Sequence, residues 1–222
     1  HLDNAWKIIF RNVFRHKRRA FLTSTGVIFS TALLLIAISM KDSVDFMVEQ
    51  QYSNIQDYDI KINFSKFLNL QELDSIRSID GVAGMEPILE TGVEIQNGWR
   101  KKSTGLTAVV KDPKMYRVVD KSGNQVDLPD RGIVVPERLV ELLGIRLNDR
   151  IFLKPLLPGK EKIEVPVKGI AVQYIGMSAY TPLEDVNYIM NEGIIVNSAV
   201  LKLENKSYEE EVKDTLKDMS AV

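Results

Sequence analysis

The sequence contains no cysteine and only two histidines among its 222 residues. Without cysteine the chain cannot form disulfides, thiolate nucleophiles or cysteine-ligated zinc sites. Both histidines, His1 and His16, lie near the start of the chain. The residues after His16 therefore cannot form a histidine-dependent catalytic triad or bind a metal through histidine.

Glycine-rich phosphate loops are also missing, because the glycines are scattered through predicted turns instead of lying between a strand and a helix. Gly176-Met-Ser178-Ala-Tyr180 is one residue short of a nucleophile elbow, and no histidine is available to activate Ser178. We interpret this stretch as a loop that leads into a helix. The sequence predicts a chain that is not an enzyme and holds no catalytic, cofactor or metal site.

Charge is distributed unevenly along the chain, although the overall charge is only −1. Residues 1–20 hold six cations and one acid, a net charge of +5, and the remainder carries −6. Nucleic-acid binding usually needs a basic stripe across the folded body, which is missing here. We expect no nucleic-acid partner.

One long stretch, from Ala20 to Met40, carries no charge at all. As a helix it spans roughly 30 Å, the thickness of the bilayer hydrocarbon. The flanking cations lie on one side only, so we expect residues 1–19 to stay in the cytoplasm and the residues after about 40 to lie outside it. The alternative is a cleaved signal peptide, because Ala37-Ile38-Ser39 resembles a cleavage site, but the run is longer than a typical signal core.

Within this run, Gly26 and Ser30 lie one helical turn apart. Small residues at this spacing let membrane helices approach each other closely. We predict that Gly26 and Ser30 form a helix-packing surface of a transmembrane helix at residues 20–40.

Before the run, apolar residues recur at helical spacing, with cations on the other faces. This pattern predicts an amphipathic helix that lies in the cytoplasmic membrane interface, with Trp6 at headgroup depth. The residues expected to seat this segment, residues 1–19, against lipid are Trp6, Arg11, Arg15, Arg18 and Arg19.

After the run, the helical spacing continues through Val44, Met47, Val48 and Ile55. We expect residues 41–57 to extend the membrane helix as a stalk, with contacts made by Val44, Met47 and Val48.

Residues 58–222 combine strand and helix patterns and predict a mixed α+β outer domain, which could divide into two lobes. Asn97-Gly98 predicts a hairpin between two strands within 82–110, and 111–131 is expected to be a polar loop. Thr181-Pro-Leu-Glu184 predicts a capped helix that runs to Met190. Further strands are expected at 58–64, 150–154, 163–172 and 194–203, and further helices at 70–79, 136–143 and from Ser207. Asn69 with Glu72 predicts a cap for the first of these helices, and Gly144 predicts a left-handed end for the second. The last helix is expected to bury Tyr208, Val212, Leu216 and Met219 on one face.

The order of these features resembles the FtsX-like permease family, which includes MacB, LolC, LolE and FtsX. "RNVFRHKRRAFLTSTGVIFSTALLLIAISMKDSV" is similar to the basic elbow and first membrane helix of such permeases. The segments "DYDIKI", "IRSIDGVAGMEPI", "IVVPERLVELLGIRLNDRIFL", "VPVKGIAV" and "AYTPLEDVNYIM" resemble successive parts of the MacB-like periplasmic core domain. Asn148-Asp149 departs from the family, whose members often carry Gly-Asp there.

The resemblance implies a fragment of the permease subunit of an ABC transporter in the cell (inner) membrane. Such a subunit couples cytoplasmic ATP hydrolysis to an outer domain for export, lipoprotein release or mechanotransmission. The implied partners are a cytoplasmic ABC ATPase that binds the ATP, a second permease half or a second copy, membrane lipid, and an extracytoplasmic substrate or adaptor. Two alternatives stay open, a single-span ligand-binding or sensor module and an exported enzyme with a cleaved leader.

Overall fold

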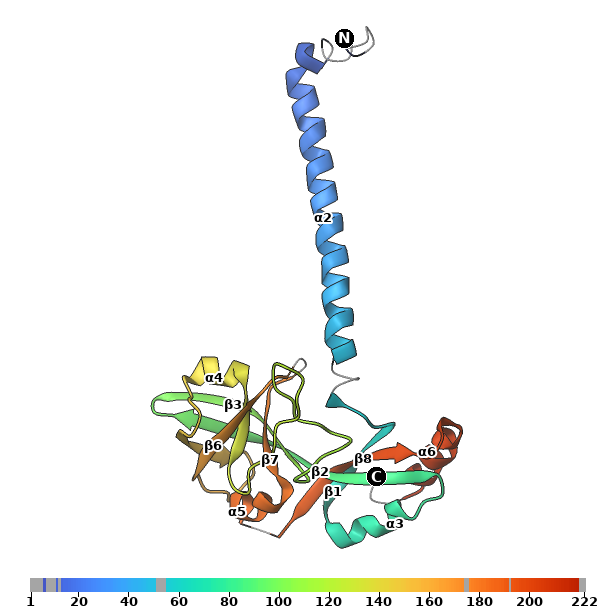
Figure 1. Cartoon of the computed structure of the whole chain (residues 1–222), viewed down its shortest axis with the longest axis vertical. Helices are drawn as coiled ribbons and strands as arrows, with labels where there is room; N and C mark the ends of the chain where they lie inside the picture. Colours follow the sequence, from blue (N-terminus) through green and yellow to red (C-terminus); the bar gives the residue numbers. More distant parts are fainter. Residues whose placement is uncertain are drawn as a thin grey trace. The chain divides into compact units, whose positions relative to one another are not determined.

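The computed structural model describes residues 6, 11, 13–50, 55–173, 176–191 and 193–219. The chain forms two units, His1–Met47 and Val48–Val222. Most of the first unit belongs to one helix, α2 (Lys17–Gln50), drawn in blue in Figure 1. The second unit is the mixed α+β domain that the sequence predicts, so the expected fold class is confirmed.

Eight strands form one mixed sheet in the second unit, in the order β1-β8-β2-β3-β7-β4-β6-β5. Their bounds are β1 Ile60–Asn69, β2 Val82–Asn97, β3 Arg100–Val109, β4 Ile133–Pro136, β5 Arg150–Pro155, β6 Ile163–Ala171, β7 Ser178–Pro182 and β8 Ile195–Leu203. The pairs β3–β7 and β4–β6 are parallel, and the other neighbours are antiparallel.

Strand β2 is shared by two parts of the sheet (Figure 1). Its 16 residues extend over roughly 50 Å, which is long enough to pair with different strands along its length. Residues 82–88 pair with β8, whereas 89–97 pair with β3 and 93–96 also pair with β5. The strands β2-β3-β7-β4-β6-β5 therefore close into a ring, and β1 and β8 continue the sheet beyond it.

Short helices lie in the segments that connect these strands and in the segment that follows β8. They are η2 Leu70–Leu73, α3 Asp74–Arg77, α4 Glu137–Leu143, η3 Leu183–Asp185, α5 Val186–Met190, η4 Lys206–Tyr208 and α6 Glu209–Lys217. The predicted capping of η2 is confirmed, because the backbone N–H of Asn69 donates to the Glu72 carboxylate at 2.8 Å. Helix α4 ends at Gly144 with φ +63°, the left-handed stop that the sequence indicates.

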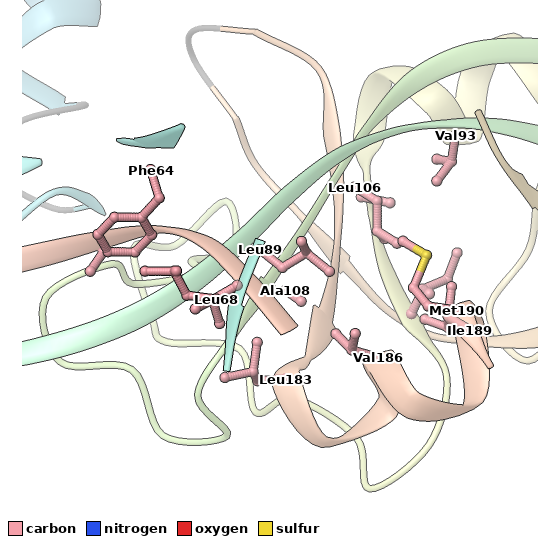
Figure 2. Packing of buried hydrophobic residues seen from close by; sticks show 14 of the residues in the cluster. Phe64, Leu68, Leu89, Val93, Leu106, Ala108, Leu183, Val186, Ile189 and Met190 are labelled. Atoms are coloured by element: carbon pink, nitrogen blue, oxygen red, sulfur yellow. The ribbon is translucent and has the colours of Figure 1, made fainter. Parts of the chain in front are cut away.

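The larger hydrophobic core joins the strands to the helices of the second unit. In Figure 2, Leu183, Val186, Ile189 and Met190 from η3 and α5 share one cluster with residues of β1, β2 and β3. Val212 and Leu216 of α6 pack into the same cluster, as their helical spacing predicts. A second cluster around Tyr116 and Tyr180 binds the loop 111–131 to the sheet.

The predicted helix that runs to Met190 is confirmed as η3 and α5, but its predicted start and cap at Thr181 are wrong. Thr181 lies in β7, fully buried, and its hydroxyl donates to the Gly132 carbonyl at 3.1 Å instead of capping a helix. Ser178 also belongs to β7, so the interpretation of 176–180 as a loop is corrected to a strand from Ser178 onward. Strand β7 forms because its backbone pairs in parallel with β3, a strand about 70 residues earlier in the chain. The local sequence around Thr181 does not reveal this pairing.

Candidate functional site

Helix α2 is long and apolar enough to cross a membrane, by length and composition. The stretch Lys17–Glu49 has a mean hydropathy of 2.1 in its most apolar window, and none of that window is buried. The helix's 34 residues extend over about 50 Å, against about 30 Å of bilayer hydrocarbon. A core helix of a folded domain would be covered by other elements, and this one is not.

The hydroxyl groups of α2 are bound within the helix itself. Thr23 donates to the Arg19 carbonyl at 2.9 Å, Thr25 to Phe21 at 2.8 Å and Ser30 to Gly26 at 2.9 Å. Polar groups in hydrocarbon are costly unless they are hydrogen-bonded. These side chains are therefore compatible with lipid.

The cations that precede the apolar stretch are exposed. Arg15, Arg18 and Arg19 are exposed on the helical segment at the start of the described chain, with a turn at His16. Trp6 is 54% exposed and helical, and Arg11 is also exposed. Leu2 and Ile9, which the predicted amphipathic helix also uses, lie outside the described residues, so that helix and its seating on lipid stay a prediction.

Gly26 and Ser30 lie on an open surface of α2. A methyl group built at Gly26 meets no atom within 4 Å other than its own helix and neighbours. Within the described residues nothing packs on this surface, so its use against another membrane helix stays a prediction.

Of the predicted stalk residues, Val44, Met47 and Val48 lie on α2 with 53%, 39% and 42% of their surface exposed. Ile55 does not continue this series. It is only 1% exposed and lies in the second unit, where its carbonyl accepts a hydrogen bond from Arg117 N at 2.8 Å. Assigning Ile55 to an exposed stalk is therefore wrong, since its apolar side chain belongs to the core of the folded domain.

Residues 55–59, which we call the entry strap, are held to the domain by backbone hydrogen bonds. Asp57 N donates to the Met115 carbonyl at 2.8 Å, and Asp59 N donates to the Leu201 carbonyl at 2.9 Å. The Asp59 carboxylate accepts from Leu203 N at 2.9 Å. The strap thus joins the loop 111–131 and strand β8.

Charge and aromatic contacts reinforce the entry strap. The Asp57 carboxylate accepts from Lys202 at 2.7 Å and from Arg117 at 3.4 Å, and the hydrogen bond from Lys202 lowers the pKa of Asp57. The ring of Tyr58 stacks on Tyr116 with centroids 6.4 Å apart, and burial raises the pKa of Tyr116 to about 12. Both ion pairs are about half exposed, so the buried contacts dominate the attachment.

A cleft of about 770 Å³ opens between the β5–β6 connection and α5. Arg131 lies over the ring of Tyr188 at 5.0 Å, and Lys160 donates to the Met190 carbonyl at 2.6 Å. Asp185, on the same wall, accepts from Gly132 N at 2.7 Å, and burial raises the pKa of its carboxyl group. The walls carry charges of both signs and polar backbone groups, which suits a polar ligand better than an apolar one.

Metal-binding side chains do not converge in the part of the chain that the structure describes. Across the described ranges, no three His, Cys, Asp or Glu side chains come together as metal ligands. Ser178, the serine that the sequence analysis compared with a nucleophile, donates its backbone N–H to the Gln173 side chain and lies at the start of β7.

No protein-family model and no curated protein sequence matches the chain. Solved structures do match it. The extracellular domain of the noncanonic ABC-type transporter YknZ from Gram-positive bacteria is 12% identical to this chain, with a TM-score of 0.50. The match covers 69% of this chain and 88% of the YknZ domain. The periplasmic region of MacB from Actinobacillus actinomycetemcomitans is 11% identical to this chain, with a TM-score of 0.51. The match covers 77% of this chain and 87% of the MacB region.

Both matches cover at least two thirds of the chain, and they agree with the resemblance read from its sequence motifs. At these sequence identities the two matches establish the fold of the domain and do not establish its activity. The chain therefore carries a domain with the MacB-like periplasmic core fold, preceded by an apolar helix of membrane-spanning length.

Proposed function

We propose that this chain is part of the permease subunit of an ABC transporter of the FtsX, MacB and LolCE type. Helix α2 spans the cell membrane, residues before it lie in the cytoplasm, and the second unit lies outside. ATP is bound by a separate ATPase subunit or domain. The observation that carries the proposal is the uncovered apolar helix α2 directly before a domain with the MacB-like fold.

The proposed domain organisation is a cytoplasmic elbow at 1–19, a span at 20–40, a stalk on α2 from 41 to 50, and an outer domain that includes the entry strap at 55–59 and runs to 222. Cations precede the span and the acidic body follows it, which supports this orientation. Gly26 and Ser30 would pack against another membrane helix, from a second permease half or a second copy. Val44, Met47 and Val48 would make the stalk contacts.

The entry strap supports a role of this chain in coupling movement of the membrane span to the outer domain. The chain leads from Gln50 through residues 51–54, which lie outside the described set, to the strap at 55–59. Since the strap is bonded to both the loop 111–131 and β8, a displacement that reaches the strap would be passed on to the sheet. Such a displacement is what nucleotide-driven closure of an attached ATPase would supply.

The test is to co-express the full-length gene product with the ABC ATPase encoded beside it and to purify the complex in detergent. We expect the ATPase to co-purify and its hydrolysis rate to change with the permease present. An ABC ATPase from an unrelated importer is the control and should not bind. If the neighbouring ATPase is not recruited, the permease assignment fails.

A single-span ligand-binding module is the second candidate, and the cleft beside α5 is the observation that favours it. The same purification discriminates the two. A sensor module would be recovered without an ATPase, and the sequence beyond Val222 would encode a stop or a signalling domain instead of further apolar spans.

A further inference from the structure

The tip of the β2–β3 hairpin presents one strongly exposed aromatic side chain. Trp99 is 84% exposed, whereas among the described residues of the second unit the next most exposed large apolar side chain, Leu156, is 55% exposed. A tight turn with Gly98 at φ +57° places Trp99 at the tip. The Arg100 guanidinium lies 5.2 Å from the ring centroid of Trp99. Burial of an indole side chain is strongly favourable, and Trp99 does not gain that free energy while it is exposed to water. Trp99 is therefore suited to contact a binding partner.

Further cations lie on the hairpin and on the strand beside it. Lys101 and Lys102 follow Arg100 on β3, and Lys162 lies 4.0 Å from the ring centroid of the exposed Phe152 on β5, the strand that pairs with β2 at Gln96. Glu94 is paired with Lys101 at 3.6 Å, but among the described residues Arg100, Lys102 and Lys162 form no ion pair. The tip patch is defined by Trp99, Arg100, Lys101, Lys102, Phe152 and Lys162, and it is basic on a body whose net charge is negative.

The tip patch is held rigidly. The hairpin is paired without interruption from Leu89–Ala108 to Asn97–Arg100. The Asn97 side chain donates to the carbonyls of Leu143 and Gly144, both at 3.2 Å, and so ties the tip to the end of α4. Lys162 donates to the Gln96 side chain at 2.8 Å. Binding at this patch would therefore need little ordering of the chain.

We propose that the tip patch docks on the anionic lipid headgroups of the bilayer that the chain itself spans. Tryptophan prefers the headgroup region, and each nearby lysine or arginine is attracted to an anionic membrane surface. The tip is a narrow turn, whereas a stable protein interface needs about 800 Å² on each partner and several buried anchors, so the shape favours lipid. The span would tether the patch to the same membrane and raise its local concentration. This inference rests on the proposed span.

The chain has two tryptophans, so Trp6→Phe leaves Trp99 as the only indole emitter. The 222-residue chain that carries W6F is reconstituted in nanodiscs of phosphatidylcholine or phosphatidylglycerol, with and without brominated acyl chains. We expect Trp99 fluorescence to shift to the blue and to be quenched by bromine in the anionic discs only, and added salt to reverse both effects. The double variant Lys101→Gln/Lys102→Gln should lower the ratio of docked to free tip by about fivefold for each charge removed.

The matched control is Lys66→Gln/Lys206→Gln, which removes the same charge from exposed sites elsewhere on the domain and should leave quenching unchanged. Equal quenching in neutral and anionic discs, or no quenching while the protein still migrates with the discs, overturns the inference and leaves the span intact. A blue shift without bromine quenching would indicate a protein neighbour and would also overturn it. Protein that does not enter nanodiscs at all would refute the span and the proposed function instead.

Discussion

The backbone of Gly132 is constrained by its conformation and by close neighbours. Its N–H donates to the Asp185 carboxylate and its carbonyl accepts from Thr181, so it joins the start of β4 to β7 and η3. Its φ is +116°, and a methyl group placed there would approach the Pro166 carbonyl oxygen to 2.5 Å. Both the conformation and the space therefore require glycine.

We predict that Gly132→Ala destabilises the outer domain by about 3 kcal/mol or more, from backbone strain and overpacking together. The control is Gly123→Ala, which has φ +79° but no atom within 4 Å and should cost about 1 kcal/mol. The measurement is the free energy of unfolding of the full chain in detergent, followed by circular dichroism. Equal costs for the two variants would show that crowding at Pro166 contributes nothing.

At the scale of single residues, the sequence predicted local signals well and failed where a distant strand decided. Asn69 with Glu72 and the stop at Gly144 act within a few residues, and both are found as predicted. Thr181 carries the same kind of local capping signal but is drawn into β7, because pairing with β3 and the hydrogen bond to Gly132 outweigh it.

At the scale of elements, the entry strap depends on burial more than on charge. Ile55 is 1% exposed, while the ion pairs of Asp57 with Lys202 and Arg117 are about half exposed and contribute little in water. Deleting a buried isoleucine side chain down to alanine typically costs about 2–5 kcal/mol.

We therefore predict that Ile55→Ala destabilises the outer domain by about 2–4 kcal/mol and accelerates amide hydrogen exchange in residues 55–59. Asp57→Asn should cost less than about 1 kcal/mol. Val44→Ala, at a position on α2 that is 53% exposed, is the control and should leave exchange in the strap unchanged. A larger loss from D57N than from I55A would refute the dominance of burial.

The helix α2 illustrates what an element's sequence can establish. Its apolar length, the cations before it and its internally bonded hydroxyls all follow from residues close together in the chain. Ile55, by contrast, has helical spacing and yet belongs to the domain, since spacing alone does not show where a helix leaves the membrane and a fold begins.

At the scale of the whole molecule, the absence of cysteine makes the proposed orientation directly testable. In the 222-residue chain, His16→Cys and Ser122→Cys each introduce a single thiol at an exposed position, one on either side of the proposed span. A membrane-impermeant maleimide added to intact cells, or to spheroplasts where an outer membrane intervenes, should label S122C and leave H16C unlabelled until the cells are lysed. Labelling of both from outside, or of neither, would contradict a single crossing between residues 20 and 40.

By itself, the sequence determined most of the strands and helices, the position of the uncharged stretch, and the mixed α+β class of the outer domain, because these depend on periodicity, charge and capping within short stretches. Only the tertiary structure decided the ring closed by β2 and β5, the strand β7, the burial of Ile55 and the exposed cationic tip at Trp99. Each of these depends on contacts between residues far apart in the chain, whose pairing is set by the packing of the entire core and leaves no mark in any single segment.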